Sequence, residues 1–176
     1  MTDTPRKSAQ ASGTDSYVLF ELAGATYALL SDDIQQLEMV GQPPPTPVPN
    51  APSYVEGVVA VRGQVIPAVN LRARFGFPAT PHDVRSRLLV IRAEGRTVGL
   101  IVDSAREFAC IPPEAVLPLP DGLASLSGRY LRGIAHRGDR VMLVVDIREL
   151  LEIDANPIDP APTETAMEPA LLGAPL

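Results

Sequence analysis

The sequence has few of the residues from which disulfide-bonded, metal-binding or membrane-spanning proteins are built. It contains one cysteine among 176 residues, so no disulfide can form within the chain. Neither of its two histidines, His82 and His136, has a cluster of further ligands at metal-binding spacing around it. The polar N-terminus is unlike a signal peptide, and the longest apolar run, 141–145, is far too short to cross a bilayer. These absences predict a cytoplasmic protein without a metal.

Signatures of catalysis and of nucleic-acid binding are absent as well. The chain has no GxSxG, GxGxxG or GxxxxGK[ST] motif. Its 15 basic and 21 acidic residues give a net charge of −6, which argues against nucleic acid as the main partner. Cys110 lies in the apolar segment FACI and is expected to be a buried, inert thiol. Asp32, Asp33 and Asp103 follow predicted hairpins and are interpreted as turn or cap residues. We therefore expect neither an enzyme nor a cofactor.

What the sequence does contain is an internal duplication. Residues 17–33 align without a gap on 88–104, and residues 57–75 align on 133–151. The matched pairs are Gly24 with Gly95, Thr26 with Thr97, Leu29 with Leu100, Asp32 with Asp103, Gly57 with Gly133, Asn70 with Asp146, and Arg72 with Arg148. A duplicated unit of this length predicts two similar modules of one architecture, and the seam between two modules is a common binding place.

Each copy has the pattern of five short strands and one helical turn. The predicted elements are, in the first copy, a hairpin from Tyr17, a third strand at 34–40, a proline-rich loop at 42–52, a hairpin at 57–69 and a helix capped by Asn70, and, in the second, a hairpin at 88–102, a strand at 104–111, a proline-rich excursion at 112–128, a hairpin at 130–145 and a helix capped by Asp146. Five twisted strands can close on themselves, which predicts two small β-barrels side by side. Apolar residues at successive positions, as in 88–91, predict burial on both faces of the strands.

The predicted organisation is a disordered arm, one folded region and a disordered tail. The arm covers 1–15 and the Pro/Ala-rich tail 154–176. Between them, 16–153 forms the folded region, with pseudo-repeats at 17–76 and 87–152.

The segment NAPSYVEGVVAVRGQVIPAVNLRARFG, residues 50–76, resembles the signature of the CheW chemotaxis coupling proteins. The resemblance extends over about 17–152. It implies a mainly β fold of two SH3-like five-stranded barrels with short capping helices and no catalytic site. It also implies a non-catalytic adaptor that joins the regulatory domain of a CheA-type histidine kinase to the cytoplasmic tip of chemoreceptors. The chain departs from the family pattern at Asn70, often Asp, and at Gln36, often Glu.

The resemblance also implies two sets of binding residues. The kinase-binding set lies around the third strand and comprises Ile34, Gln36, Leu37 and Val40. The receptor-binding set is expected in a groove between the barrels and comprises Gly57, Val58, Arg62, Gly63, Leu88, Val102 and Phe108. Arg62 precedes Gly63 at a hairpin tip, from which its guanidinium could form bidentate bonds to a carboxylate or to carbonyls at a helix end. The alternative for Arg62 is a solvated turn residue.

Other functions remain open at this stage. The chain could serve a pilus-type or another non-flagellar chemosensory pathway, or it could be a small-ligand sensor that uses the seam. Its proline run at 43–49 has the P-x-x-P spacing of polyproline ligands, although a stiff loop is the simpler interpretation. An open apolar seam would favour the adaptor, whereas a closed pocket with a few convergent polar groups would favour the sensor.

Overall fold

The structure of the chain is a computed structural model that describes residues 13–41, 43–123 and 128–152. The predicted tail and nearly all of the predicted N-terminal arm lie outside the described residues. The strands are β1 (Asp15–Leu22), β2 (Ala25–Leu30), β3 (Ile34–Met39), β4 (Val55–Val61), β5 (Gln64–Asn70), β6 (Arg87–Ala93), β7 (Arg96–Val102), β8 (Ser104–Ile111), β9 (Leu131–Arg137) and β10 (Arg140–Val145). The helices are α1 (Leu71–Arg74) and α2 (Ile147–Glu152), with short 3-10 turns at Ser31–Asp33, Pro113–Ala115 and Gly128–Tyr130.

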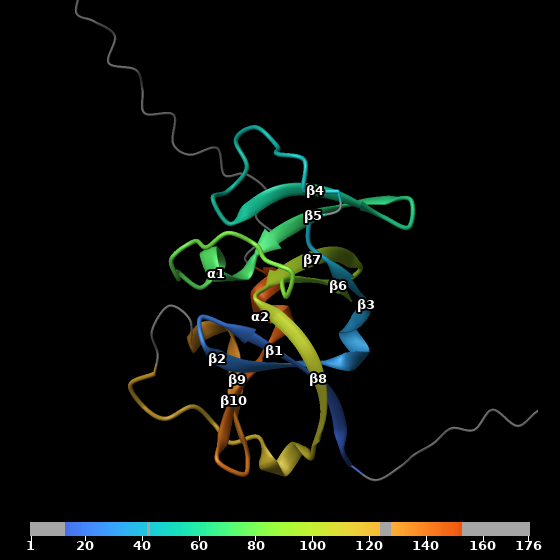
Figure 1. Cartoon of the computed structure of the whole chain (residues 1–176). Helices are drawn as coiled ribbons and strands as arrows, with labels where there is room; N and C mark the ends of the chain where they lie inside the picture. Colours follow the sequence, from blue (N-terminus) through green and yellow to red (C-terminus); the bar gives the residue numbers. More distant parts are fainter. Residues whose placement is uncertain (1–12, 42, 124–127, 153–176) are drawn as a thin grey trace, which may run out of the picture.

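The strands form two five-stranded sheets of mixed direction. Sheet A has the order β8-β1-β2-β10-β9, and sheet B has the order β3-β6-β7-β5-β4. In Figure 1 the strands of sheet A lie in the lower part of the molecule, and the β4–β5 hairpin of sheet B lies at the top. This arrangement confirms the predicted mainly β fold with two five-stranded units.

The two sheets do not coincide with the two sequence copies. Sheet A takes β1 and β2 from the first copy and three strands from the second, while sheet B takes β6 and β7 from the second copy and three strands from the first. The expectation that the five strands of one copy close on themselves is therefore wrong. The first hairpin of each copy is exchanged, and parallel pairing of β10 with β2 and of β5 with β7 holds it in place.

The exchange preserves the predicted relation between the copies. Each strand of sheet A occupies the same place in its sheet as its sequence counterpart occupies in sheet B, because β1, β2, β8, β9 and β10 correspond to β6, β7, β3, β4 and β5. The two orders are then identical. The topology agrees with an approximate two-fold relation between the sheets.

Both helices begin where their caps predict. The Asn70 side-chain oxygen accepts a hydrogen bond from the Ala73 amide at 3.2 Å, at the start of α1. The Asp146 carboxylate accepts from the amide of Arg148 at 3.0 Å, at the start of α2. These side chains satisfy first-turn amides that have no partner inside the helix. The predicted helix starts are confirmed.

Apolar side chains are buried on both faces of each sheet, as the strand pattern predicts. The largest core cluster lies between the sheets and includes Phe20 and Leu29 from sheet A with Leu89 and Leu100 from sheet B. A second cluster covers the other face of sheet A, and a third covers the other face of sheet B. We call the first cluster the seam core.

In each copy, the proline-rich loop crosses the strand that follows it, β4 in the first copy and β9 in the second. Thr46 pairs with Val58 on β4, and Leu117 pairs with Ile134 on β9. A Cβ atom on Gly57 would overlap the Thr46 carbonyl oxygen, and one on Gly133 would overlap the Leu117 carbonyl oxygen. This close approach of two backbones explains why both copies have glycine at the matched position.

Candidate functional site

The seam between the sheets is filled by side chains. Four aromatic rings, those of Phe20, Tyr27, Phe75 and Tyr130, follow one another with centroid separations of 5.5, 5.7 and 5.4 Å. Phe20 and Tyr27 come from sheet A, whereas Phe75 directly follows α1. The seam of the described chain is thus neither the open groove expected of an adaptor nor the polar pocket expected of a sensor.

A charged cluster fastens α1 to the turn between β1 and β2. The Arg72 Nε atom lies 2.7 and 3.0 Å from the two carboxylate oxygens of Asp103, and the Ala23 amide donates to the same carboxylate at 2.9 Å. Burial acts to raise the pKa of Asp103, but the hydrogen bonds from Arg72 and Ala23 and the charge of Arg72 outweigh it, so the pKa is lowered. The same hydrogen bond raises the pKa of Arg72.

Asp103 is therefore more than the turn residue that the sequence suggested. The repetition of Asp32 as Asp103 and of Arg72 as Arg148 in the two copies is the signal that could have revealed it. The counterpart pair is not formed, because Arg148 lies 3.4 Å from Glu94 instead, with both side chains exposed.

The sequence also gave no indication of a polar cluster at the connector between the copies. His82 Nε2 lies 2.8 and 2.7 Å from the two carboxylate oxygens of Glu56. The Asn70 side-chain amide donates to the same carboxylate, while its oxygen caps α1. His82 thus ties the connector to sheet B.

The predicted kinase-binding strand, β3, presents its residues on two faces. A bulge between Ile34 and Gln36 shifts the register against β6. Ile34 packs on the seam core, and Val40 packs on the core cluster at the opposite face of sheet B. Gln36 is half-buried on that same opposite face, beside Val90. Leu37 is paired with Leu89 on the seam side, where it is 37% exposed.

The predicted receptor-binding residues do not gather in one groove. Val102 is 1% exposed within the seam core, and Leu88 is 5% exposed on the opposite face of sheet B. Phe108 is 64% exposed on β8, the edge strand of sheet A. Val58 is half-buried on β4 beside the buried Gly57. Of the set, Phe108 and the tip residues Arg62 and Gly63 are exposed.

Arg62 and Gly63 form the turn between β4 and β5. Both have positive φ, 48° and 79°. Ala23-Gly24 and Glu94-Gly95 show the same pattern, so the left-handed backbone is a property of these tight turns and does not single out Arg62. The Arg62 side chain is exposed and makes no hydrogen bond or ion pair with the described residues.

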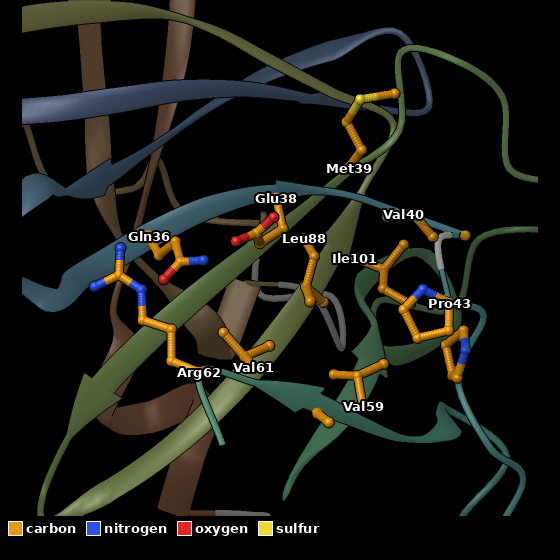
Figure 2. Close-up of a pocket in the computed structure, with 13 residues that line it drawn as sticks. Gln36, Glu38, Met39, Val40, Pro43, Val59, Val61, Arg62, Leu88 and Ile101 are labelled. Atoms are coloured by element: carbon orange, nitrogen blue, oxygen red, sulfur yellow. The ribbon is translucent and has the colours of Figure 1, made fainter. Parts of the chain in front are cut away.

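Sheet B is open between its two edge strands, β3 and β4, and a cavity of about 150 Å³ lies in the gap. Figure 2 shows Arg62 extending from the end of β4 toward Gln36 on β3. Glu38 also lines the cavity, together with apolar side chains that include Val59, Val61, Leu88 and Ile101, and with Pro43 from the proline-rich loop. The corresponding gap in sheet A is spanned by ion pairs from Glu107 on β8 to Arg137 and Arg140 at 3.0 and 2.9 Å.

The prediction that Cys110 is a buried thiol is wrong. Cys110 is exposed on β8, between the buried Ala109 and Ile111. An edge strand with one face toward solvent alternates buried and exposed positions, and Cys110 falls on the outer one.

Neither a metal centre nor a membrane span is found in the part of the chain that the structure describes. No three His, Cys, Asp or Glu side chains there lie close enough together to hold an ion. No helix there combines the length and the apolar character that crossing a bilayer requires.

Comparisons with known proteins give the class of the chain. A family model described as the CheW-like domain matches residues 16–155. The chemotaxis protein CheW of Klebsiella aerogenes is 28% identical over 135 residues, which cover 77% of this chain and 80% of that protein. The CheW of Rhizobium meliloti is 34% identical over 110 residues, covering 62% and 71%. The crystal structure of the scaffolding protein TtCheW from Thermoanaerobacter tengcongensis matches with a TM-score of 0.69 and 28% identity, over 76% of this chain and 89% of that one.

The paired five-stranded sheets and the packed seam define a mainly β protein with the fold of TtCheW. The chain belongs to the CheW-like family, whose model covers its described strands and helices. The resemblance inferred from residues 50–76 is thereby confirmed.

Proposed function

We propose that this chain is a cytoplasmic adaptor that couples chemoreceptors to a CheA-type histidine kinase within receptor arrays. The observation that carries the proposal is the CheW-like match over residues 16–155 together with a fold shared with a scaffolding protein. The packed seam of the described residues leaves no enclosed polar pocket there for a small ligand. The reading as a small-ligand sensor is therefore not favoured.

The kinase contact is assigned to the exposed side of β3. Leu37 is 37% exposed and Met39, which follows it on the same face, is 59% exposed. Ile34 and Val40 are half-buried and support the strand from its two faces, and Gln36 lines the gap between β3 and β4. Exposed apolar side chains on an edge strand are suited to association with a second β domain.

The receptor contact is assigned to the accessible members of its set. Arg62 and Gly63 project at the tip of the β4–β5 hairpin, which points to the upper right in Figure 1. Gly57 and Val58 support this hairpin at the crossing of the proline-rich loop, and Phe108 offers a separate apolar contact on β8. Val102 is too buried to touch a partner and would act only through packing, whereas Leu88 lines the cavity between β3 and β4.

Replacing Leu37 by Asp tests the adaptor function at its kinase surface. We expect the affinity for the kinase regulatory domain to fall by at least about 2 kcal/mol, roughly 30-fold in Kd, because a charge would enter an apolar contact. Isothermal titration calorimetry with the purified kinase regulatory domain measures the Kd of each variant. The matched control is Val141→Asp, since Val141 is 48% exposed on sheet A. Unchanged affinity in a folded Leu37→Asp protein would refute the placement, and no binding by the wild-type chain would refute the function.

A further inference from the structure

A second recess lies at the hairpin-tip end of sheet B, on the face opposite the seam. Its volume is about 670 Å³, and its lining includes Arg62 and Arg92, the carboxamides of Gln35, Gln36 and Gln64, and Thr97. Gln36, Val61 and Arg62 also line the apolar cavity between β3 and β4. The two hollows therefore adjoin along the open side of the sheet, and the first differs from the second in having one carboxylate, Glu38, and several apolar side chains in its lining.

The recess is cationic and lacks an internal counter-ion. No Asp or Glu is among its lining residues, although the whole chain has a net charge of −6. Neither Arg62 nor Arg92 forms an ion pair or hydrogen bond with the described residues. Glu94 is the acidic residue nearest to Arg92 in the sequence, and its carboxylate is directed to Arg148 on α2. Two unpaired guanidinium groups beside neutral hydrogen-bonding side chains are suited to a carboxylate.

Strand register places Arg92 inside this recess and its neighbour Arg96 outside it. Arg92 is paired with Thr97 and follows Val90 on the face opposite the seam. Arg96 is paired with Ala93, which packs on the seam core, so it belongs to the other face. Leu37 also lies on the seam side, whereas its neighbour Gln36 faces the recess.

We propose that the recess is an anionic-ligand site in which Arg92 and Arg62 hold a carboxylate of the receptor's cytoplasmic tip. The assignment rests on the proposed function, because it adds Arg92 and a carboxylate ligand to the receptor contact proposed at Arg62. Charge complementarity supports it: an acidic protein segment is the partner that a carboxylate-free arginine recess selects. The apolar part of the adjoining cavity, formed by Val59, Val61, Leu88 and Ile101, would take a neighbouring apolar side chain of the same segment.

The existence of the site is tested on the free protein with two short amidated peptides, one containing two adjacent glutamates and the other glutamine in their place. Arginine Nε–H signals are followed by NMR during titration. We expect saturable shifts at Arg92 and Arg62 with the glutamate peptide and at least about tenfold weaker binding of the glutamine peptide. Equal binding of the two peptides, or shifts that spare both arginines, would overturn the site.

The occupant is tested with Arg92→Glu and the matched control Arg96→Glu, against a helical-hairpin receptor fragment and the kinase regulatory domain. We expect Arg92→Glu to weaken receptor binding at least about tenfold, while Arg96→Glu changes it by less than about twofold. Equal effects of the two variants, or a loss confined to kinase binding, would overturn the assignment to the receptor. If the wild-type chain binds neither partner, the proposed adaptor function is wrong. The peptide titration then still tests whether the recess binds a carboxylate.

Discussion

Gly57 should be needed for the stability of this protein, because the proline-rich loop crosses β4 at that residue. The loop crosses β4 at Gly57, where Thr46 and Val58 exchange two backbone hydrogen bonds of 2.8 and 2.9 Å. Gly57 has a φ of 149°, and an added Cβ would overlap the Thr46 carbonyl. The change Gly57→Ala must therefore move the loop or the strand.

The expected loss follows from these contacts. Two backbone hydrogen bonds are worth about 1 kcal/mol each, and a non-glycine residue at such a φ costs roughly 1–3 kcal/mol. We expect Gly57→Ala to lower the free energy of unfolding by about 3 kcal/mol. For a chain of this size that corresponds to a melting temperature about 10 °C lower. Because Pro43 and Pro45 line the cavity beside β3, receptor and kinase binding should weaken as well.

Urea unfolding followed by circular dichroism measures the loss, and Gly63→Ala is the matched control. Gly63 also has a positive φ, 79°, but no atom lies within 4 Å of its added Cβ. Its replacement should cost only about 1 kcal/mol, from backbone strain alone. If the two variants are equally stable, the loop crossing is not what requires glycine at position 57, and the reasoning fails.

Two further predictions concern the charged side chains. Asp103→Asn should lower stability by about 1–2 kcal/mol at neutral pH, because charge-assisted bonds to a carboxylate that is 31% exposed are lost. The lowered pKa of Asp103 means that this contribution disappears as pH falls through and below the ordinary carboxyl range, so acid titration of unfolding should bring wild type and variant together; a difference that persists in acid would contradict it. Arg62→Ala and Arg62→Lys should both weaken binding of the receptor fragment by roughly tenfold, since Lys lacks the planar fork. Their melting temperatures should stay near wild type, because Arg62 makes no hydrogen bond or ion pair with a described residue. Normal receptor binding by a folded Arg62→Ala protein would show that Arg62 is only a solvated turn residue.

The strands and caps could be predicted because each depends on a short stretch of sequence. Alternating or continuous apolar residues mark the strands, and Asn70 and Asp146 mark the helix starts. The exchange of hairpins could not be predicted in the same way. β1 and β6 have equivalent patterns, so pairing within a copy and pairing across copies would bury the same side chains.

The site was harder to predict because strands buried on both faces hide which face a residue occupies. A shift of one residue moves a side chain to the other face of a sheet. Leu88 and Val102 were expected to line a groove, yet one packs on the outer core cluster of sheet B and the other in the seam. The bulge between Ile34 and Gln36 likewise separates residues that the sequence places on one strand. Neither feature has a local sequence signal.

Strand exchange has a consequence for how an adaptor transmits binding. Each sheet contains strands from both copies, so neither copy can separate from the other without breaking strand pairs. The seam core and the bond from Arg72 to Asp103 hold the two sheets in one orientation. A partner at Leu37 on β3 and a second partner at the β4–β5 tip are then fixed relative to one another by strands of the same sheet. A rigid body of this kind avoids the entropy of ordering two flexible sites, so the binding energy at each surface is retained for positioning the partners.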